Sequence, residues 1–391
     1  MKISSRKCAM FTKDIWDSYQ INRCLKKRWQ AVYDLKKTFL AEDNNLADEY
    51  KKSVDAFYLK HYGETVDYTW HELCFRLTGE FDIRYFPSPL YFAEFERFEN
   101  INQAFTDVLT DKNFIPIVAK GFGISMPKML LNCTCGVYRN AKNEFIDRTE
   151  VEKYLNSCGE VVIKPSVDSW GGTDVKLVCF KQGVDQYSGE TIETILKKYG
   201  DDFVVQERLR SHESLRKIYP ESINNFRVVS YRWRDEIRIC PAFLRIGHGG
   251  SFVDNICSGG FSVGIDDDGV LVGAALFEEM GAHIDRHPDT GLKFEGYVLP
   301  GFVKILNAVR RLHENIPQVG CCNWDFTLSE EEEPVLIEAN VMNGGGCDSS
   351  QLSHGKAFFG EHTAEILRWL RVVKKTPMSK RKQYMFGYGV D

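Results

Sequence analysis

The segment 321–340, CCNWDFTLSEEEEPVLIEAN, is predicted to form two strands joined by an acidic turn. Side chains alternate between the two faces of a strand, so Leu336, Glu338 and Asn340 are expected on one face. A four-residue loop makes the strand pairing symmetric and sets Asp325 opposite Glu338. Two facing carboxylates repel each other unless a divalent cation lies between them. Oxygen ligands on rigid strands suit Mg²⁺, so the pattern predicts a magnesium site; the alternative is a hydrated acidic surface.

A lysine ends an apolar strand-like stretch in VVIKPSVDSWGGTDVKLV, residues 161–178. Backbone N–H groups and hydroxyls of the Ser/Gly-rich loop, together with the ammonium of Lys164, can bind phosphate oxygens. The loop lacks the GxxxxGK[ST] pattern, so it is not a Walker A loop. Taken alone, the segment also fits a glycine hairpin with a surface lysine.

Two further segments have weaker signals. In FVVQERLRSHESL, residues 203–215, an apolar strand runs into polar residues that can offer groups to an adenine edge and to ribose hydroxyls. Arg227 and Arg245 fall within strand-like segments, where a half-buried arginine needs an anionic partner. The alternative for the two arginines is a pair of structural ion pairs.

These blocks occur in the order and at the spacing of the ATP-grasp superfamily, and they resemble most its sugar-transfer-associated branch, which is linked to exopolysaccharide and teichuronopeptide synthesis. The resemblance covers about residues 100–370. It rests on DK at 111–112, VVIKP at 161–165, VVQE at 204–207, NNFRVV at 224–229, WDF at 324–326 and IEAN at 337–340, with HPDTGLKFEGYVLPG (287–301) and VMNGGG (341–346). It implies an α+β fold of the ATP-grasp type, in which two α+β subdomains grip ATP between antiparallel sheets, after a mainly helical N-terminal region.

The resemblance also implies roles for single residues. It implies Lys164 and Arg227 as catalytic candidates, with Arg227 facing the transferred phosphate or acyl phosphate; Arg245 is a further catalytic candidate from its place in a strand-like segment. Nucleotide-binding candidates are Lys112 and Lys164 for phosphates, Ser166, Gly171, Gly172 and Thr173 in the lid, Gln206, Glu207 and Leu209 for adenine, and Glu213 for ribose. Lys176 is either a third phosphate contact or only a strand residue. Asp325, Glu338 and Asn340 are the implied ligands of Mg²⁺, with Mn²⁺ as an alternative.

Composition excludes several classes of protein. The chain has 391 residues, with 50 Lys and Arg against 55 Asp and Glu, and its net charge of −5 argues against a nucleic-acid-coating protein. No apolar run is long enough to span a membrane, and the N-terminus lacks the apolar core of a signal peptide, so a cytoplasmic location with reduced cysteines is expected. The predicted division is a helical region 1–105, a segment 106–209 with the first ATP-grasp subdomain and its phosphate lid, a second subdomain 210–375 with the metal site, and a basic tail 376–391.

The predicted function is that of an ATP-dependent carboxylate–amine ligase with an acyl-phosphate intermediate. The expected partners are ATP, a carboxylate donor and an amine acceptor, drawn from amino acids, sugar acids or peptides; family analogy suggests surface polysaccharide biosynthesis. Three alternatives stay open: a kinase that phosphorylates a hydroxyl, a ligase that modifies a peptide, and an inactive nucleotide-binding scaffold. The sequence also leaves a homo-oligomer open.

Overall fold

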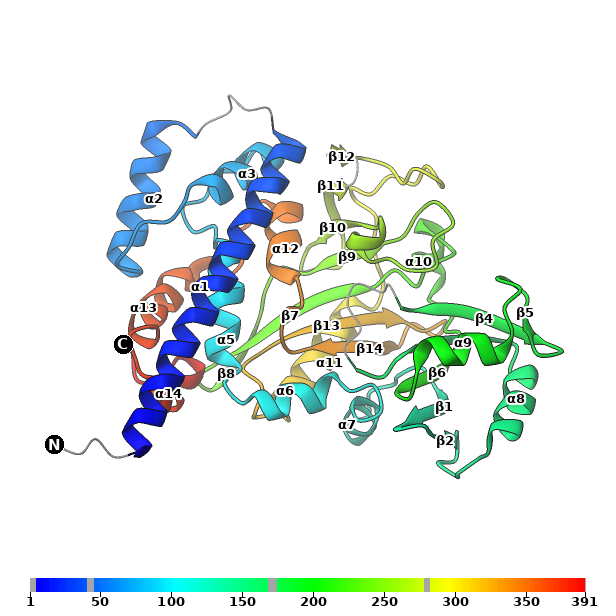
Figure 1. The fold of residues 1–391 in the computed structure, drawn as a ribbon. Helices are drawn as coiled ribbons and strands as arrows, with labels where there is room; N and C mark the ends of the chain where they lie inside the picture. The colour runs from blue at the N-terminus through cyan, green and yellow to red at the C-terminus, as the bar shows by residue number, and fades with distance from the viewer. Residues whose placement is uncertain (1–4, 41–45, 168–173, 278–281, 391) are drawn as a thin grey trace.

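The computed structural model describes residues 5–40, 46–167, 174–277 and 282–390 (Figure 1). One side of the molecule is a layer of helices, in which the long α1 runs beside shorter N-terminal and C-terminal helices. Its N-terminal part comprises α1 (Ser5–Phe39), α2 (Asp48–His61), α3 (Thr69–Thr78), α4 (Ser88–Leu90), a π-helical turn (Tyr91–Phe95) and α5 (Glu96–Glu99). The predicted helical N-terminal region is therefore observed.

A six-stranded antiparallel sheet with order β2-β1-β6-β3-β4-β5 forms the smaller α+β unit. Its elements are β1 (Met129–Thr134), β2 (Val137–Asn140), α8 (Arg148–Ser157), β3 (Glu160–Pro165), β4 (Lys176–Lys181), β5 (Val184–Asp185), α9 (Ile192–Tyr199) and β6 (Phe203–Glu207), preceded by α6 (Gln103–Thr110) and α7 (Ile115–Gly121). Ile163 and Val205 pack into the core of this unit with residues of α8 and α9. Because side chains alternate along a strand, their neighbours Lys164 and Gln206 point to the opposite face.

The larger sheet is antiparallel with order β12-β11-β10-β9-β7-β13-β14, and β8 pairs with β7. Its strands are β7 (Phe226–Trp233), β8 (Glu236–Ile239), β9 (Phe243–Ile246), β10 (Phe261–Ile265), β11 (Leu271–Phe277), β12 (Ala282–Ile284), β13 (Cys321–Leu328) and β14 (Pro334–Asn340); its helices are α10 (Glu213–Ile218), α11 (Phe302–Glu314), α12 (Gly346–His354) and α13 (Thr363–Val373). Short 3₁₀ turns cover Ile256–Ser258, Gly360–His362 and Lys382–Gly387. The two sheets with their helices confirm the predicted α+β class.

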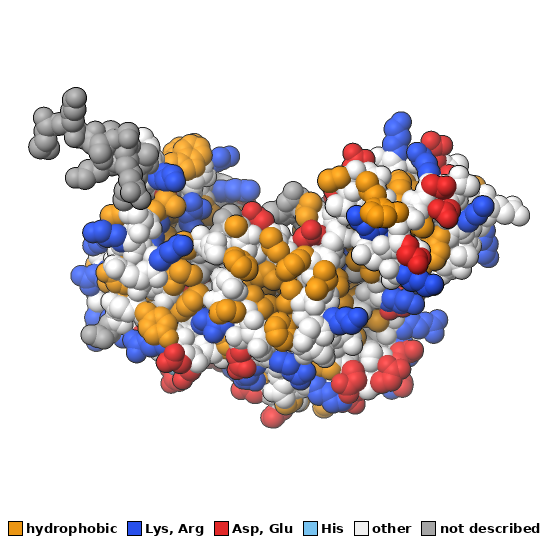
Figure 2. Space-filling model, turned by 90° about the horizontal axis from the view of Figure 1, so that it is seen from below, with side chains coloured by type: hydrophobic (Ala, Val, Ile, Leu, Met, Phe, Trp, Pro, Cys, Tyr) orange, Lys and Arg blue, Asp and Glu red, His pale blue; other side chains and the backbone are white. Residues whose placement is uncertain are grey.

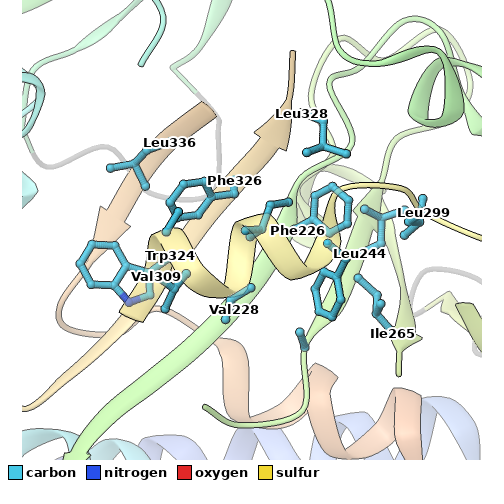
Figure 3. Packing of buried hydrophobic residues seen from close by; sticks show 14 of the residues in the cluster. Phe226, Val228, Leu244, Ile265, Leu299, Val309, Trp324, Phe326, Leu328 and Leu336 are labelled. Carbon is cyan, nitrogen blue, oxygen red and sulfur yellow. The ribbon is translucent and has the colours of Figure 1, made fainter. Parts of the chain in front are cut away.

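The core of the larger unit lies between the sheet and α11 (Figure 3). Phe226 and Val228 of β7 and Trp324 and Phe326 of β13 turn one face of their strands toward Val309 of α11. The alternating positions of the same strands therefore face away from this core.

The β13–β14 hairpin pairs Asp325 with Glu338, as predicted, but its register is not uniform. A β-bulge lies between this pair and the next, which joins Phe326 to Leu336. A bulge places one extra residue on one strand, and here it turns Leu336 into the core, where it is fully buried. The predictions of a symmetric four-residue loop and of Leu336 on the face of Glu338 are therefore wrong.

Of the expected tail 376–391, the described residues 376–390 pack against the helical layer through α14 (Met378–Arg381) and the turn that follows. The guanidinium of Arg381 is buried in an ion pair with Asp17 of α1, and Trp369 donates a hydrogen bond to the carbonyl of Tyr384. On the face seen from below, hydrophobic side chains gather at the centre, in the region of α6 and α7 (Figure 2). Across the described ranges, no helix is both long and apolar enough to cross a membrane.

Candidate active site

A cavity of about 650 Å³ lies where the two sheets meet, and it collects most of the residues that the sequence singled out. The smaller unit contributes Lys112, Lys164, Gln206 and Glu207, the segment after β6 contributes Leu209, and the larger sheet contributes Arg227, Arg245, Asp325, Glu338 and Asn340. Lys164 and Gln206 in the smaller sheet, and Arg227 and Asp325 in the larger one, lie on strand faces that point away from the two cores, whereas Lys112 and Leu209 come from connecting segments. Strand alternation in both sheets thus builds one polar site.

Two lysines and one acid form the part of the cavity between the units. Lys112 donates its backbone N–H to the carbonyl of Ser166 at 2.9 Å, and its Nζ lies 3.3 Å from Oε1 of Glu338. Burial lowers the pKa of Lys164 to about 8, with a smaller contribution from the charge of Lys112, while Glu338 opposes the shift. Two cations beside one carboxylate leave an excess of positive charge that suits phosphate oxygens.

Asp325 is the centre of a second charged group. Nε and Nη2 of Arg227 donate to its two carboxylate oxygens at 2.5 and 3.0 Å, and Nη2 of Arg245 lies 3.2 Å from Oδ2. Nδ2 of Asn340 also donates to Oδ2 at 3.3 Å, and Arg227 bonds to the carbonyl of Gly344. The bidentate pair is almost fully buried, so the anionic partner that the sequence demanded for Arg227 is Asp325.

The donors for a metal ion fit a hard cation. Asp325 and Glu338 are paired across the hairpin, and Asn340 lies two residues beyond Glu338 on the cavity wall. Two carboxylates and one amide suit Mg²⁺, whose remaining ligands are water and nucleotide phosphates. Within the described ranges, no cluster of three or more His, Cys, Asp or Glu side chains could hold an ion, so the site would depend on such outside ligands.

The end of the cavity beside β6 has the features of a pocket for a flat polar ring. Val162, Leu209 and Ile337 line it with apolar surface. Gln206 is 2% exposed, and its Nε2 has no hydrogen-bond partner in the described part of the chain, so this donor suits a ligand acceptor. The carboxylate of Glu207 instead accepts the backbone N–H of Lys128 at 2.9 Å, which fixes the rim.

Several predicted site residues do not line the cavity. Glu213 is exposed and pairs with Lys217, and Lys176 pairs with Glu190 at 2.9 Å. Ser166 is buried, and its backbone groups bond to Lys112 and Asp202. Gly171, Gly172 and Thr173 lie outside the described residues.

The cavity also contains charged residues that the sequence analysis missed. Asp254 is 2% exposed, accepts the backbone N–H of Asn225 at 2.7 Å and lies 3.5 Å from Arg245. The sequence feature that could have indicated Asp254 is the Asp-Asn pair before a glycine-rich turn. Arg28 of α1 and Asp348 of α12 line another wall, and nothing in their local sequences distinguishes them.

Comparisons with known proteins identify a family for most of the chain. Residues 91–365 match the family model described as sugar-transfer associated ATP-grasp, whereas no curated protein matches the chain. Among solved structures, a D-alanine–D-alanine ligase from Bacillus anthracis is 14% identical with a TM-score of 0.37, covering 71% of this chain and 69% of that one.

Two other solved structures are similar at the same low level. An L-amino acid ligase from Bacillus licheniformis is 14% identical with a TM-score of 0.35, covering 66% of this chain and 48% of that one. The ADP complex of purK, an N5-carboxyaminoimidazole ribonucleotide synthetase, is 10% identical with a TM-score of 0.37, covering 63% and 50%. The chain therefore spans about half the length of these two proteins.

Proposed function

Because the chain belongs to the sugar-transfer associated ATP-grasp family, we propose that it joins a carboxylate to an amine with the use of ATP. The observation that supports this most is the single cavity in which Lys112, Lys164 and two arginines surround the Asp325–Glu338 pair. Phosphoryl transfer depends mainly on positioning and on neutralisation of charge on the phosphoryl oxygens, and these groups supply both.

The proposed reaction has two steps. An oxygen of the substrate carboxylate attacks the γ-phosphorus of ATP, the bond to the β–γ bridging oxygen breaks, and ADP leaves. The amine nitrogen then attacks the acyl carbon, the bond between that carbon and the phosphate oxygen breaks, and inorganic phosphate leaves with an amide as product. The first step raises the reactivity of the carbonyl carbon, so no nucleophile from the protein is needed.

The residues of the cavity have separate tasks in this scheme. Lys112 and Lys164 bind phosphate oxygens, while Arg227 and Arg245 offset the charge of the acyl phosphate. Asp325, Glu338 and Asn340 would hold Mg²⁺, which when bound neutralises charge on the nucleotide phosphates. Gln206 and the apolar wall beside it would orient the base.

The substrate assignment is a finer proposal. The sugar-transfer association of the family supports a sugar acid of a surface polysaccharide, or its precursor, as one substrate and an amino acid or peptide as the other. This step is an analogy at the level of the family, because related sites act on many substrates.

A screen for ADP release tests the proposal. Amino acids are combined pairwise with uronic acids in the presence of ATP and Mg²⁺, and mass spectrometry identifies the product. ADP release that requires both substrates, with an amide product, supports the ligase. ADP release without an amine, with a phosphorylated hydroxyl as product, would instead establish a kinase, and Lys164→Ala should abolish turnover in either case.

A further inference from the structure

One wall of the cavity is built by the helical N-terminal region and by the loop that precedes α12. Arg28 from α1, Asn343, Gly344 and Gly345 from the loop, and Asp348 from the first turn of α12 line it together. Arg28 lies outside the residues 91–365 that match the family, whereas Asp348 and the loop lie within them.

The guanidinium of Arg28 is held in place by neutral groups. It stacks over the ring of Phe92 at 3.6 Å from the centroid and donates to Oδ1 of Asn343 at 3.1 Å. It forms no salt bridge with any residue in the described part of the chain. These contacts fix the direction of the side chain, and its charge also acts on the nearby carboxyls of Glu96 and Asp348 without an ion pair to either, so a ligand anion can still pair with it.

Asp348 carries the opposite charge on the same wall. One of its oxygens has a hydrogen bond with the hydroxyl of Ser88, while Oδ1 is shielded from water without a partner among the described residues. Burial raises the pKa of the Asp348 carboxyl, and the charge of Arg28 opposes this shift only in part. A buried carboxylate oxygen without a donor is costly, so a ligand that supplies N–H groups would be favoured there.

Arg28 and Asp348 share the wall without forming an ion pair with each other. A ligand with an anionic and a cationic group side by side would satisfy both at once. We propose that this wall binds the α-carboxylate of a free amino acid at Arg28 and its α-ammonium at Asp348, which makes a free amino acid the amine-bearing substrate. This inference rests on the proposed ligase function for the fate of the amine.

The loop connects this wall to the phosphate-binding part of the cavity. Gly344 accepts a hydrogen bond from Arg227, which also holds Asp325. A Cβ on Gly344 would lie 2.3 Å from Cγ of Asn323, so only glycine lets the loop approach β13 this closely. An amino acid on the wall therefore lies next to the residues that would bind the acyl phosphate.

The test measures binding of single amino acids to the full chain in the presence of ADP and Mg²⁺. Calorimetry first identifies the tightest binder among the common amino acids, and this probe is compared with its decarboxylated amine and its deaminated acid. Charge-assisted contacts of this type predict about a 10- to 100-fold preference for the amino acid over either fragment. Arg28→Met should remove the preference over the amine, and Asp348→Asn should remove the preference over the acid.

Controls separate binding from folding. Arg23→Met alters an exposed arginine of the same helix that does not line the cavity, so it should keep the parental preference. Arg28→Lys keeps the charge and should give an intermediate loss. ATP affinity should be unchanged in both Arg28 variants. Equal binding of amino acid and amine by the parent, or parental selectivity in Arg28→Met, would overturn the inference.

The outcomes also distinguish this inference from the proposed function. Selective amino acid binding that depends on Arg28 and Asp348, with no ADP release for any carboxylate, would leave the binding site intact and refute the ligase. ADP release with amines that lack a carboxylate, at the same KM as with amino acids, would refute only the amino acid site.

Discussion

Nucleotide affinity should fall as pH rises through 8, because one of the phosphate-binding cations loses its charge there. Burial lowers the pKa of Lys164 to about 8 from 10.5, and the ammonium form is the one that attracts phosphate. The protonated fraction then falls from about nine tenths at pH 7 to about one tenth at pH 9. If only this form binds phosphate strongly, the Kd rises about tenfold, which is about 1.4 kcal/mol.

Calorimetric titration with ATP and constant free Mg²⁺ at pH 7, 8 and 9 measures this effect. Lys164→Arg retains its charge over the whole range, so its affinity should be flat with pH. Lys164→Met should bind ATP weakly and also without this pH dependence. A flat profile in the parent, or an equal slope in Lys164→Met, would show that Lys164 does not titrate against the nucleotide.

Five variants test separate parts of the structure by urea unfolding, and two of them are also tested by turnover. Lys164→Met should stabilise the chain at pH 7 by roughly 3 kcal/mol, because the folded lysine is still charged at this pH and burial of that charge costs free energy that the unfolded chain does not lose. Burial lowers the pKa of His313 to about 3, so the unfolded chain takes up a proton below pH 6.5 and the folded chain does not. The free energy of unfolding of the parent should therefore fall by about 2 kcal/mol more than that of His313→Gln between pH 7 and pH 5. Gly344→Ala should lower both stability and turnover because its Cβ collides with Asn323. Asp325→Asn should cost about 3 kcal/mol by leaving Arg227 without a counterion, since Arg245 keeps Asp254, whereas Glu338→Gln should abolish Mg²⁺-dependent turnover with little loss of stability; equal destabilisation by both would contradict the assigned ion pairs.

The parts of the site that the sequence predicts are those that follow from strand periodicity. Alternation along a single strand turns Lys164 away from Ile163, as observed. The pairing of Asp325 with Glu338 is also observed, although the symmetric four-residue loop that predicts it is not. Alternation does not predict the orientation of Leu336, because a bulge interrupts the strand between it and Glu338. The backbone N–H of Leu336 donates to the carbonyl of Ser125, which is distant in the sequence, so a contact of this kind cannot be read from β14 alone.

Residues that reach the site through long-range packing could not be predicted. Arg28 comes to the cavity because α1 packs on the helices after residue 87, and its own helix gives no signal of a ligand. The role of Glu213 at the ribose stays a prediction; in the structure its carboxylate lies at the surface and pairs with Lys217, one helical turn away. The order of the motifs therefore predicts the nucleotide end of the cavity better than the wall with Arg28, which depends on tertiary contacts.

The buried pair of Arg227 and Asp325 explains how the site can hold strong positive charge before a nucleotide arrives. A guanidinium without a counterion at this depth would destabilise the fold, and Asp325 supplies the counterion. When a nucleotide binds, its phosphates can become a second anionic partner for the two arginines. A cation bound with the nucleotide would become a second partner for Asp325. Each charged group can therefore change partner without being left buried and unpaired. Donors that are already oriented need little reorganisation when charge moves onto the acyl phosphate, which is the condition under which electrostatic stabilisation is most effective. The same reasoning assigns Arg245 a supporting part, because it is shared between Asp325 and Asp254 and keeps a counterion if Asp325 turns toward a metal ion.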